Sequence, residues 1–283
     1  MPGTRFVYPL TVNLYDLDLR EEVSCATLFR YFEETALRGS AHFGFPLEWY
    51  RARQQFWVIR TMQMERLCAP RYLDELEIST WISAMARVRS DRNYLARRAS
   101  DGRVMARAIA NWVYVDAAQM QPVRIHPDIV AVFDRREKPA LSPLGKVTLQ
   151  PELPARFEFT CTRVAQCYEA DSAKHVNNAI YVDWLEEAIR DTLRAMNCAL
   201  AYDGSTPLLW FYRHALEYAR PALPGDTVSI HTRLLRCGHS FGEWEQEICH
   251  ATSGEQMLRA ITTTVWVDTR NRVVPWRAAV RTN

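Results

Sequence analysis

The sequence predicts an α+β protein made of two similar halves, each with one long helix beside an antiparallel sheet of about five strands. Three observations lead to this prediction. The 283 residues repeat one order of elements twice, each half has one long stretch with helical spacing of apolar residues, and most of the remainder is β-branched or aromatic. Because domains usually hold roughly 100–150 residues, two domains are expected.

The internal repeat appears when the chain is aligned with itself at a shift of about 152 to 153 residues. The identical pairs at the start of the alignment are Tyr15 with Tyr168, Asp18 with Asp171, Val23 with Val176, Glu33 with Glu186 and Glu34 with Glu187. After a one-residue slip the identities continue, ending at Asp116 with Asp268. An ordered series that also preserves the order of expected elements indicates a duplication.

Proline and charged residues are concentrated between the halves, at Pro127, Pro139, Pro143, Pro151 and Pro154. Since proline fixes φ and has no N–H to donate, this composition favours an extended linker over a packed element. We therefore predict an N-terminal domain over residues 1–130, a linker over 131–155 and a C-terminal domain over 156–283.

In the first half, residues 5–16 alternate apolar and polar side chains as a half-buried strand does. Ser24 is expected to cap the following helix. The expected buried face of this helix is Leu28, Phe29, Tyr31, Phe32 and Leu37. Four β-rich runs follow, and the turn dipeptide Asp101-Gly102 separates the last two.

The second half repeats this order. Residues 156–171 alternate as a strand, and a helix is expected to begin near Val176 with Asn177 or Asn178 as its cap. Its apolar stripe is Ile180, Tyr181, Trp184, Leu185, Ala188 and Ile189. Four more β-rich runs complete the half.

Composition excludes several classes of protein. The 35 basic and 33 acidic side chains are spread along the chain, so no basic stripe indicates nucleic-acid binding. The seven cysteines are odd in number and form no CxxC pair, which fits neither a disulfide framework nor a zinc site. No apolar run of signal-peptide or membrane-spanning length occurs, so a soluble cytoplasmic protein without a membrane partner is expected.

Two segments carry a family resemblance: YEADSAKHVNNAIYVDWLEEA (168–188) and EYARPALPGDTV (217–228). The first resembles the Asp-x-x-x-His-Val-Asn-Asn-x-x-Tyr signature of the hotdog thioesterase superfamily, and the second its strand and turn ending in Gly-Asp. Two such halves in one chain resemble the acyl-ACP thioesterase branch. The resemblance implies a sheet wrapped around each long helix and an internal pair of hotdogs.

The resemblance also implies the partner. The expected substrate is a thioester of acyl carrier protein or coenzyme A, with no cofactor and no metal. The chain is expected to act as a monomer with an internal hotdog pair or as a homodimer.

Hydrolysis of a thioester needs an anionic base or nucleophile and hydrogen-bond donors that face the developing oxyanion. Asp171 would activate water or attack the carbonyl directly, and His175 would orient the thioester or carry a proton. Val176, Asn177 and Asn178 would contact the substrate at the start of the helix, where unpaired N–H groups and the helix dipole favour negative charge.

Two further positions, Glu217 and Ala173, bear on this predicted site. Acyl-ACP thioesterases commonly add an acidic residue on the facing strand, and Glu217 matches it, although an ion pair of Glu217 with Arg213 or Arg220 is the alternative. The family pattern has asparagine two residues before the histidine, where this chain has Ala173. Either Asn177 or Asn178 then polarises the carbonyl, or the activity is reduced or altered.

The first half departs further from the signature. Asp18 is kept and is expected to contact substrate, but Glu22 occupies the histidine position and Ser24-Cys25 replaces the asparagine pair. Two neighbouring acids are expected to raise one another's pKa, which suits the reaction poorly. This half is therefore interpreted as a degenerate site that helps to form an acyl pocket.

Two other functions stay open. Ala173 and the degenerate first half would also fit a non-catalytic protein that binds acyl thioesters. A hotdog dehydratase or hydratase is less favoured. Such relatives have an Asp-to-His spacing that is longer by one residue or a His-Phe-Pro-Gly-type segment, and this sequence resembles neither.

Overall fold

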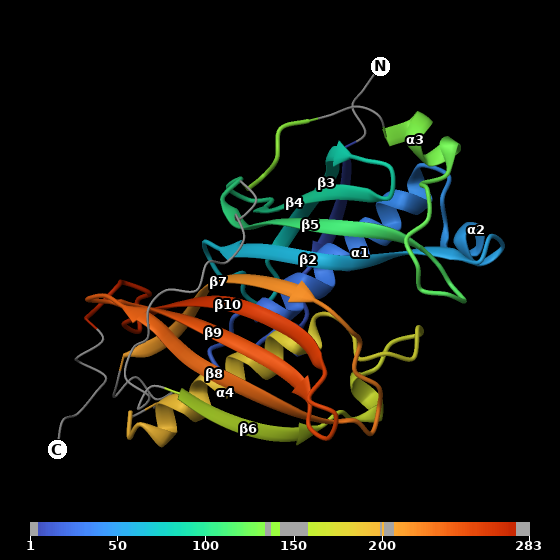
Figure 1. Cartoon of the computed structure of the whole chain (residues 1–283). Helices are drawn as coiled ribbons and strands as arrows, with labels where there is room; N and C mark the ends of the chain where they lie inside the picture. Colours follow the sequence, from blue (N-terminus) through green and yellow to red (C-terminus); the bar gives the residue numbers. More distant parts are fainter. Residues whose placement is uncertain (1–4, 134–136, 142–157, 199, 201–206, 276–283) are drawn as a thin grey trace. The chain divides into compact units, whose positions relative to one another are not determined.

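The computed structural model describes residues 5–133, 137–141, 158–198, 200 and 207–275 (Figure 1). The chain divides into two compact units, Met1–Pro143 and Leu144–Asn283. We refer to them as unit 1 and unit 2 and describe each by itself.

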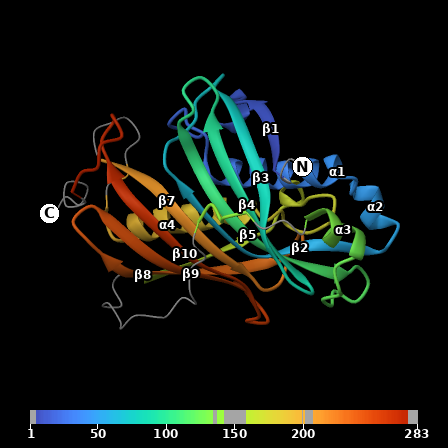
Figure 2. The same cartoon turned by 90° about the horizontal axis from the view of Figure 1, so that it is seen from above.

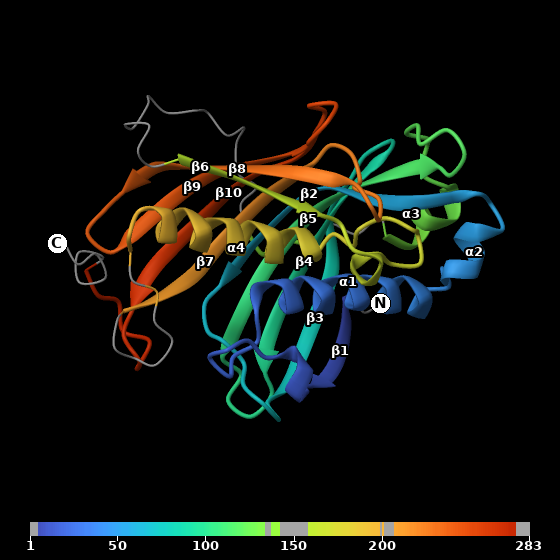
Figure 3. The ribbon, with the colours of Figure 1, turned by 90° about the horizontal axis from the view of Figure 1, so that it is seen from below.

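Unit 1 is an antiparallel sheet with one long helix on it. Its strands are β1 (Phe6–Thr11), β2 (Gln55–Arg66), β3 (Glu75–Met85), β4 (Arg89–Arg98) and β5 (Val104–Asp116), and its helices are η1 (Leu14–Asp16), α1 (Cys25–His42), α2 (Leu47–Arg51) and α3 (Pro127–Phe133). The strand order is β1-β3-β4-β5-β2. Helix α1 packs against β1 and β3 (Figure 3).

Helix α1 begins where its capping residue predicts. Ser24 has extended backbone angles, and its side chain accepts a hydrogen bond from the N–H of Thr27 at 3.1 Å. Leu28, Phe29 and Phe32 are fully buried, as predicted. The prediction is wrong for Leu37, which is 44% exposed because the last turns of α1 leave that side uncovered.

The segment after β5 differs from the predicted linker. Helix α3 ends at Phe133, so its last turn lies within the range 131–155 that was expected to be extended. Pro127 stands at the first helical position, where its missing N–H needs no partner. Ile129 and Phe133 are buried in a cluster with Phe45 and Tyr50, at the end of unit 1 where α2 and α3 lie (Figure 2).

Residues 137–141 also pack within unit 1 instead of forming a linker. The indole N–H of Trp81 donates to the carbonyl of Lys138 at 2.9 Å, and the N–H of Ala140 donates to the Asn93 side chain at 2.8 Å. Burial and paired backbone groups outweigh the local preference of the prolines here. Residues 134–136 and 142–155 of the predicted linker lie outside the described residues.

Unit 2 repeats the same topology. Its strands are β6 (Glu158–Val164), β7 (Leu208–Tyr218), β8 (Thr227–Cys237), β9 (Phe241–His250) and β10 (Gln256–Val267), and its helices are η3 (Cys167–Glu169) and α4 (Ile180–Ala195). The order is β7-β10-β9-β8-β6, and α4 packs against β6 and β8 (Figure 3). The predicted α+β layout is confirmed in both units. No described helix is long and apolar enough to cross a membrane.

A chain of buried polar side chains joins α4 to the sheet of unit 2. Glu186 Oε1 lies 3.1 Å from His214 Nε2, and His214 Nδ1 lies 3.2 Å from Thr262 Oγ1. Thr262 donates to Gln246 at 2.9 Å, and Gln246 donates to the carbonyl of Leu185 at 2.8 Å. Because each member is bonded, this network holds α4 in one position on the sheet.

Unit 1 fills the matching positions differently. Met62, Ala110 and Tyr94 stand where unit 2 has His214, Thr262 and Gln246. Tyr94 stacks on Phe32 of α1 at a centroid distance of 5.1 Å. The sheet face beneath α1 is therefore lined mainly by aliphatic and aromatic side chains.

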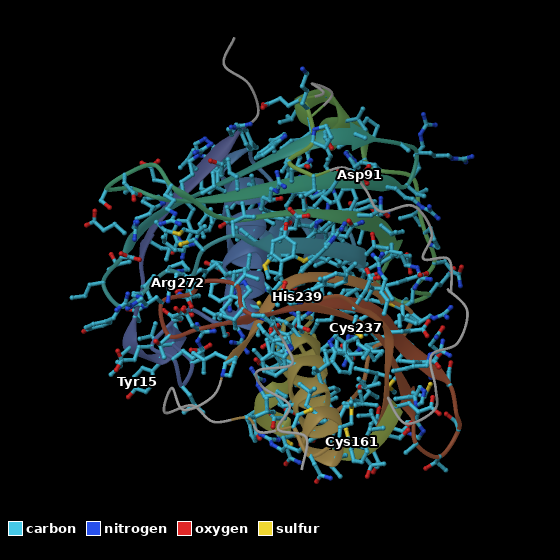
Figure 4. The ribbon with its side chains drawn as sticks, turned by 90° about the vertical axis from the view of Figure 1, so that its left-hand side faces the viewer. Tyr15, Asp91, Cys161, Cys237, His239 and Arg272 are labelled. Atoms are coloured by element: carbon cyan, nitrogen blue, oxygen red, sulfur yellow. The ribbon has the colours of Figure 1, made fainter. Side chains whose placement is uncertain are left out.

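The seven cysteines are free thiols, two of them buried at Cys25 and Cys198. Cys161 lies on β6, Cys237 is the last residue of β8, and His239 lies in the turn between β8 and β9 (Figure 4). Burial raises the pKa of the Cys161 thiol. The Cys161 thiol is therefore a poor nucleophile by comparison with an activated cysteine.

Candidate active site

The segment between β6 and α4 forms a small hairpin that holds Asp171 opposite His175. The N–H of Asp171 donates to the carbonyl of His175 at 3.0 Å, and that of Lys174 donates to the carbonyl of Asp171 at 2.9 Å. Lys174 has φ +65°, the left-handed conformation of a tight turn. Val176 ties the hairpin to Ala222 through a backbone bond of 2.9 Å. The structure thus brings the two predicted catalytic residues together.

Two hydrogen bonds orient the Asp171 carboxylate. Its Oδ1 accepts from the N–H of Ala173 at 2.8 Å, and its Oδ2 lies 3.4 Å from the amide nitrogen of Asn177. The side chain is otherwise exposed. It is therefore held in place and still accessible to water.

His175 is half-buried on the other strand of the hairpin. Among the described residues its imidazole ring makes no hydrogen bond. Both ring nitrogens are therefore free to bind a substrate atom or a water molecule.

Helix α4 begins later than predicted, at Ile180. Asn177 does not cap it directly, because its Oδ1 accepts from the N–H of Ala179 at 2.9 Å and forms a turn that precedes the helix. Asn178 accepts through its carbonyl from the Tyr218 hydroxyl at 3.0 Å. Both asparagines thus shape the entry to α4, and neither takes the predicted N-cap position.

The backbone N–H of Asn178 is available at this entry. The N–H groups of Val176, Asn177, Ala179 and Ile180 all donate within the chain. Among residues 176–180, only the backbone N–H of Asn178 has no acceptor in the described part of the structure. Its N–H is therefore the candidate donor to an anionic oxygen beside the hairpin.

Glu217 lies on the wrong face of β7 for the role predicted for it. Its neighbour Tyr218 faces α4, since the two rings Tyr218 and Tyr181 are 5.8 Å apart. Successive side chains of a strand point to opposite faces, so Glu217 points away from α4, where its side chain is exposed. Arg220, one alternative partner, pairs with Glu255 instead. The geometry gives no support to Glu217 as a third site residue.

Glu169 is a residue that sequence reasoning missed. Its buried carboxylate accepts from Arg163 at 2.6 Å, from the indole of Trp184 at 2.9 Å and from the N–H of Gln166 at 2.8 Å. Its carbonyl accepts from the N–H of Asn177 at 3.0 Å. Glu169 therefore fixes the turn from which the hairpin starts. The repeat contains a signal for it, because the matching residue Asp16 is also acidic.

The matching loop of unit 1 keeps the same backbone. The N–H of Asp18 donates to the carbonyl of Glu22 at 2.8 Å, and that of Glu21, at φ +57°, donates to the carbonyl of Asp18 at 3.0 Å. The N–H of Val23 donates to Pro70 at 2.9 Å. The duplication has thus preserved the hairpin while its side chains changed.

Arginines from this loop and from neighbouring segments approach its acidic side chains in unit 1. Arg20 and Arg71 lie 3.3 Å and 3.5 Å from the carboxylate of the buried Glu22. Burial raises the pKa of Asp18, while two backbone N–H groups and Arg66 lower it, and repulsion from Glu22 makes the smallest contribution. The expected rise in the pKa of Asp18 is therefore present, but its main cause is desolvation, and arginines neutralise Glu22.

Asp18→Asn is expected to be at least as stable as the parent chain at pH 7. A carboxyl group whose pKa is raised by folding loses stability as the pH rises from its ordinary value of about 3.9 through the raised value. The variant lacks that loss, so its advantage should shrink on going down to pH 4. Urea unfolding at several pH values checks this, and an advantage that grows toward pH 4 would contradict it.

Two family models match this chain. They are the acyl-ACP thioesterase N-terminal domain over residues 3–133 and the thioesterase-like superfamily over residues 166–283. Together they cover most of the two units.

Curated relatives are similar at low identity. Oleoyl-acyl carrier protein thioesterase 2, chloroplastic, of Arabidopsis thaliana is 23% identical over 205 residues, which is 66% of this chain and 54% of the relative. Acyl-[acyl-carrier-protein] hydrolase FATB2, chloroplastic, of Cuphea viscosissima is 22% identical over 282 residues, 92% of this chain and 62% of the relative. The chain thus spans about half to three fifths of the length of these relatives.

Solved structures share the fold. An acyl-ACP thioesterase from Bacteroides thetaiotaomicron superposes with a TM-score of 0.74 at 16% identity, over 92% of this chain and 98% of that one. The 12:0-ACP thioesterase from Umbellularia californica gives 0.74 at 18% identity, over 93% and 95%. With both units matched, the chain belongs to the acyl-ACP thioesterase family, in which two hotdog units follow one another within the thioesterase-like superfamily.

Proposed function

We propose that the chain hydrolyses acyl thioesters to a free acid and the thiol of the carrier. The observation that carries the proposal is the hairpin of unit 2, which holds an oriented, accessible Asp171 carboxylate opposite His175 at the entry to α4. The matching hairpin of unit 1 has Glu22 in an arginine cluster instead, so we assign the chemistry to unit 2.

The proposed reaction uses one water molecule. Asp171 removes a proton from the water molecule while the water oxygen attacks the thioester carbonyl carbon. The N–H of Asn178 donates to the resulting oxyanion. When the tetrahedral intermediate collapses, the C–S bond breaks and the sulfur leaves with a proton delivered through His175. Val176 and Asn177 stay in the proposal as contacts that position the thioester and the carboxylate.

The substrate class follows from the relatives. Those matched are named as acyl carrier protein thioesterases, and we propose a fatty acyl thioester on acyl carrier protein or coenzyme A, within lipid metabolism. A cytoplasmic location and a monomeric or homodimeric state remain predictions. The plant relatives are chloroplast proteins.

Release of free thiol tests the proposal. The full chain is incubated with a series of acyl-CoA and acyl-ACP substrates, and thiol is followed with a chromogenic disulfide. Turnover of at least one substrate that grows in proportion to enzyme concentration is expected. Binding of thioesters without turnover of any would instead support the non-catalytic thioester-binding alternative, for which Ala173 is the motivating feature.

Ala173→Asn is expected to raise kcat by about 3- to 10-fold, because it adds an amide donor next to the reacting carbonyl. Ala173 is exposed and its own N–H already bonds Asp171, so a longer side chain fits without displacing the hairpin. Steady-state kinetics on the best substrate measure the change. An unchanged or lower kcat with an unchanged free energy of unfolding would show that this position needs no polar side chain here.

A further inference from the structure

Arg92 is a cation placed among apolar side chains of unit 1. It lies on β4 with the same alternation as Tyr94, whose ring stacks on α1, so both face the helix-covered side of the sheet. Its Nη2 lies 3.5 Å from the hydroxyl of Ser40, near the end of α1. Its Cζ lies 5.8 Å from the centroid of the Phe133 ring.

No acid neutralises this guanidinium within the described residues. The adjacent Asp91, seen on β4 in Figure 4, alternates to the other face and accepts from the amide of Asn111 at 2.6 Å. The electrostatic neighbours of Arg92 are the hydroxyls of Tyr94 and Tyr50. Within the described residues, these hydroxyls, Ser40, the ring of Phe133 and the negative end of the α1 dipole are the groups that compensate the charge.

Such a cation is costly unless something pairs with it. Surrounding protein lowers the pKa of Arg92, yet a guanidinium stays charged at any ordinary pH. The side chain keeps part of its surface accessible, so a second molecule can reach it. Its neighbours Phe133, Tyr50 and Ile82 belong to a buried apolar cluster that also contains Phe45, Tyr114, Ile125 and Ile129.

We propose that unit 1 binds an organic carboxylate, with the carboxylate on Arg92 and the apolar body of the ligand against the Phe133 cluster. A guanidinium presents parallel N–H donors that match the two oxygens of a carboxylate. Aromatic and aliphatic walls favour an alkyl or aryl body. This inference rests on unit 1 alone and does not require the hydrolytic activity proposed for unit 2.

Binding by the full chain tests the proposal with matched probes. Decanoate and 2-naphthoate carry the carboxylate, while decanol and 2-naphthol are their neutral counterparts. Calorimetry is expected to show at least one acid binding about 10-fold or more tightly than its neutral counterpart, as a charge-assisted pair predicts. Equal affinity of acids and neutral counterparts, or no binding of either acid, would overturn the proposal.

Arg92→Met removes the charge and keeps a long unbranched side chain. It is expected to bring the affinity for the acid to within about 2-fold of that for the neutral probe, since only the ion pair is lost. Arg89→Met, an exposed change on the other face of the same strand, is the matched control and should leave both affinities unchanged.

A purely structural role for Arg92, as a partner of the end of α1, makes the opposite prediction for stability. Losing that partner would lower the free energy of unfolding, whereas removing an unpaired cation should leave it unchanged or raise it. If Arg92→Met lowers the free energy of unfolding and weakens the binding of acids and neutral probes equally, the proposed binding site is wrong. Arg92→Lys, which keeps the charge without the planar donors, should bind the acid with intermediate affinity.

Discussion

Asp171→Asn is expected to lower kcat for thioester hydrolysis by about 10²- to 10⁴-fold, the usual contribution of a positioned general base. Asparagine keeps an oxygen that can accept from the N–H of Ala173, so the hairpin should persist. It cannot take a proton from water. The free energy of unfolding should therefore change by less than about 0.5 kcal/mol, as for other exposed substitutions.

Two controls make the Asp171 result specific. Ser172→Ala changes the adjacent exposed residue and should leave kcat within about 2-fold, because it removes no group assigned to the reaction. Glu217→Gln should behave in the same way, because successive side chains of β7 point to opposite faces and that of Glu217 points away from α4. Full turnover by Asp171→Asn would remove Asp171 from the mechanism, and a large loss in Glu217→Gln would restore the third site residue.

Glu169→Ala is expected to have the largest effect on stability, a loss of about 2–3 kcal/mol in the free energy of unfolding. Breaking a buried charged pair costs about 3–5 kcal/mol, and we place this case lower because Arg163 keeps 33% of its side chain exposed. The indole N–H of Trp184 would also lose its acceptor. Hydrolytic activity should fall as well, since this turn carries the hairpin of Asp171.

Chemical denaturation followed by tryptophan fluorescence measures the Glu169 effect. Glu187→Ala is the matched control, because it removes an exposed glutamate that pairs with Arg194 on the surface of α4. Exposed pairs contribute about 0–1 kcal/mol. If Glu169→Ala were no less stable than Glu187→Ala, the turn would not depend on the buried carboxylate.

Much of the fold follows from local chemistry that a sequence displays. The alternation of residues 5–16 predicted β1, and the capping geometry of Ser24 predicted the start of α1. The repeat predicted that unit 2 copies unit 1. These features depend on neighbours within a few residues, where side-chain type and spacing decide the backbone conformation.

Features that depend on distant partners were not predictable in this way. Residues 137–141 pack through Trp81 and Asn93, which are 57 and 47 residues from their partners Lys138 and Ala140. Helix α3 packs on Phe45 and Tyr50, which are also distant in sequence, so local composition favoured a linker instead. The pairing of Glu22 was not predicted either, because Arg71 reaches Glu22 from another loop.

For the candidate site, the sequence by itself determined the duplicated hairpin and the spacing of Asp171 and His175, because a short loop brings residues four apart together. Only the tertiary structure decided that Glu217 faces away from α4 and that Glu169 is buried against Trp184. It alone also placed Arg92 among aromatic side chains. Alternation shows which side chains share a face of a strand, but which face is covered depends on packing between elements.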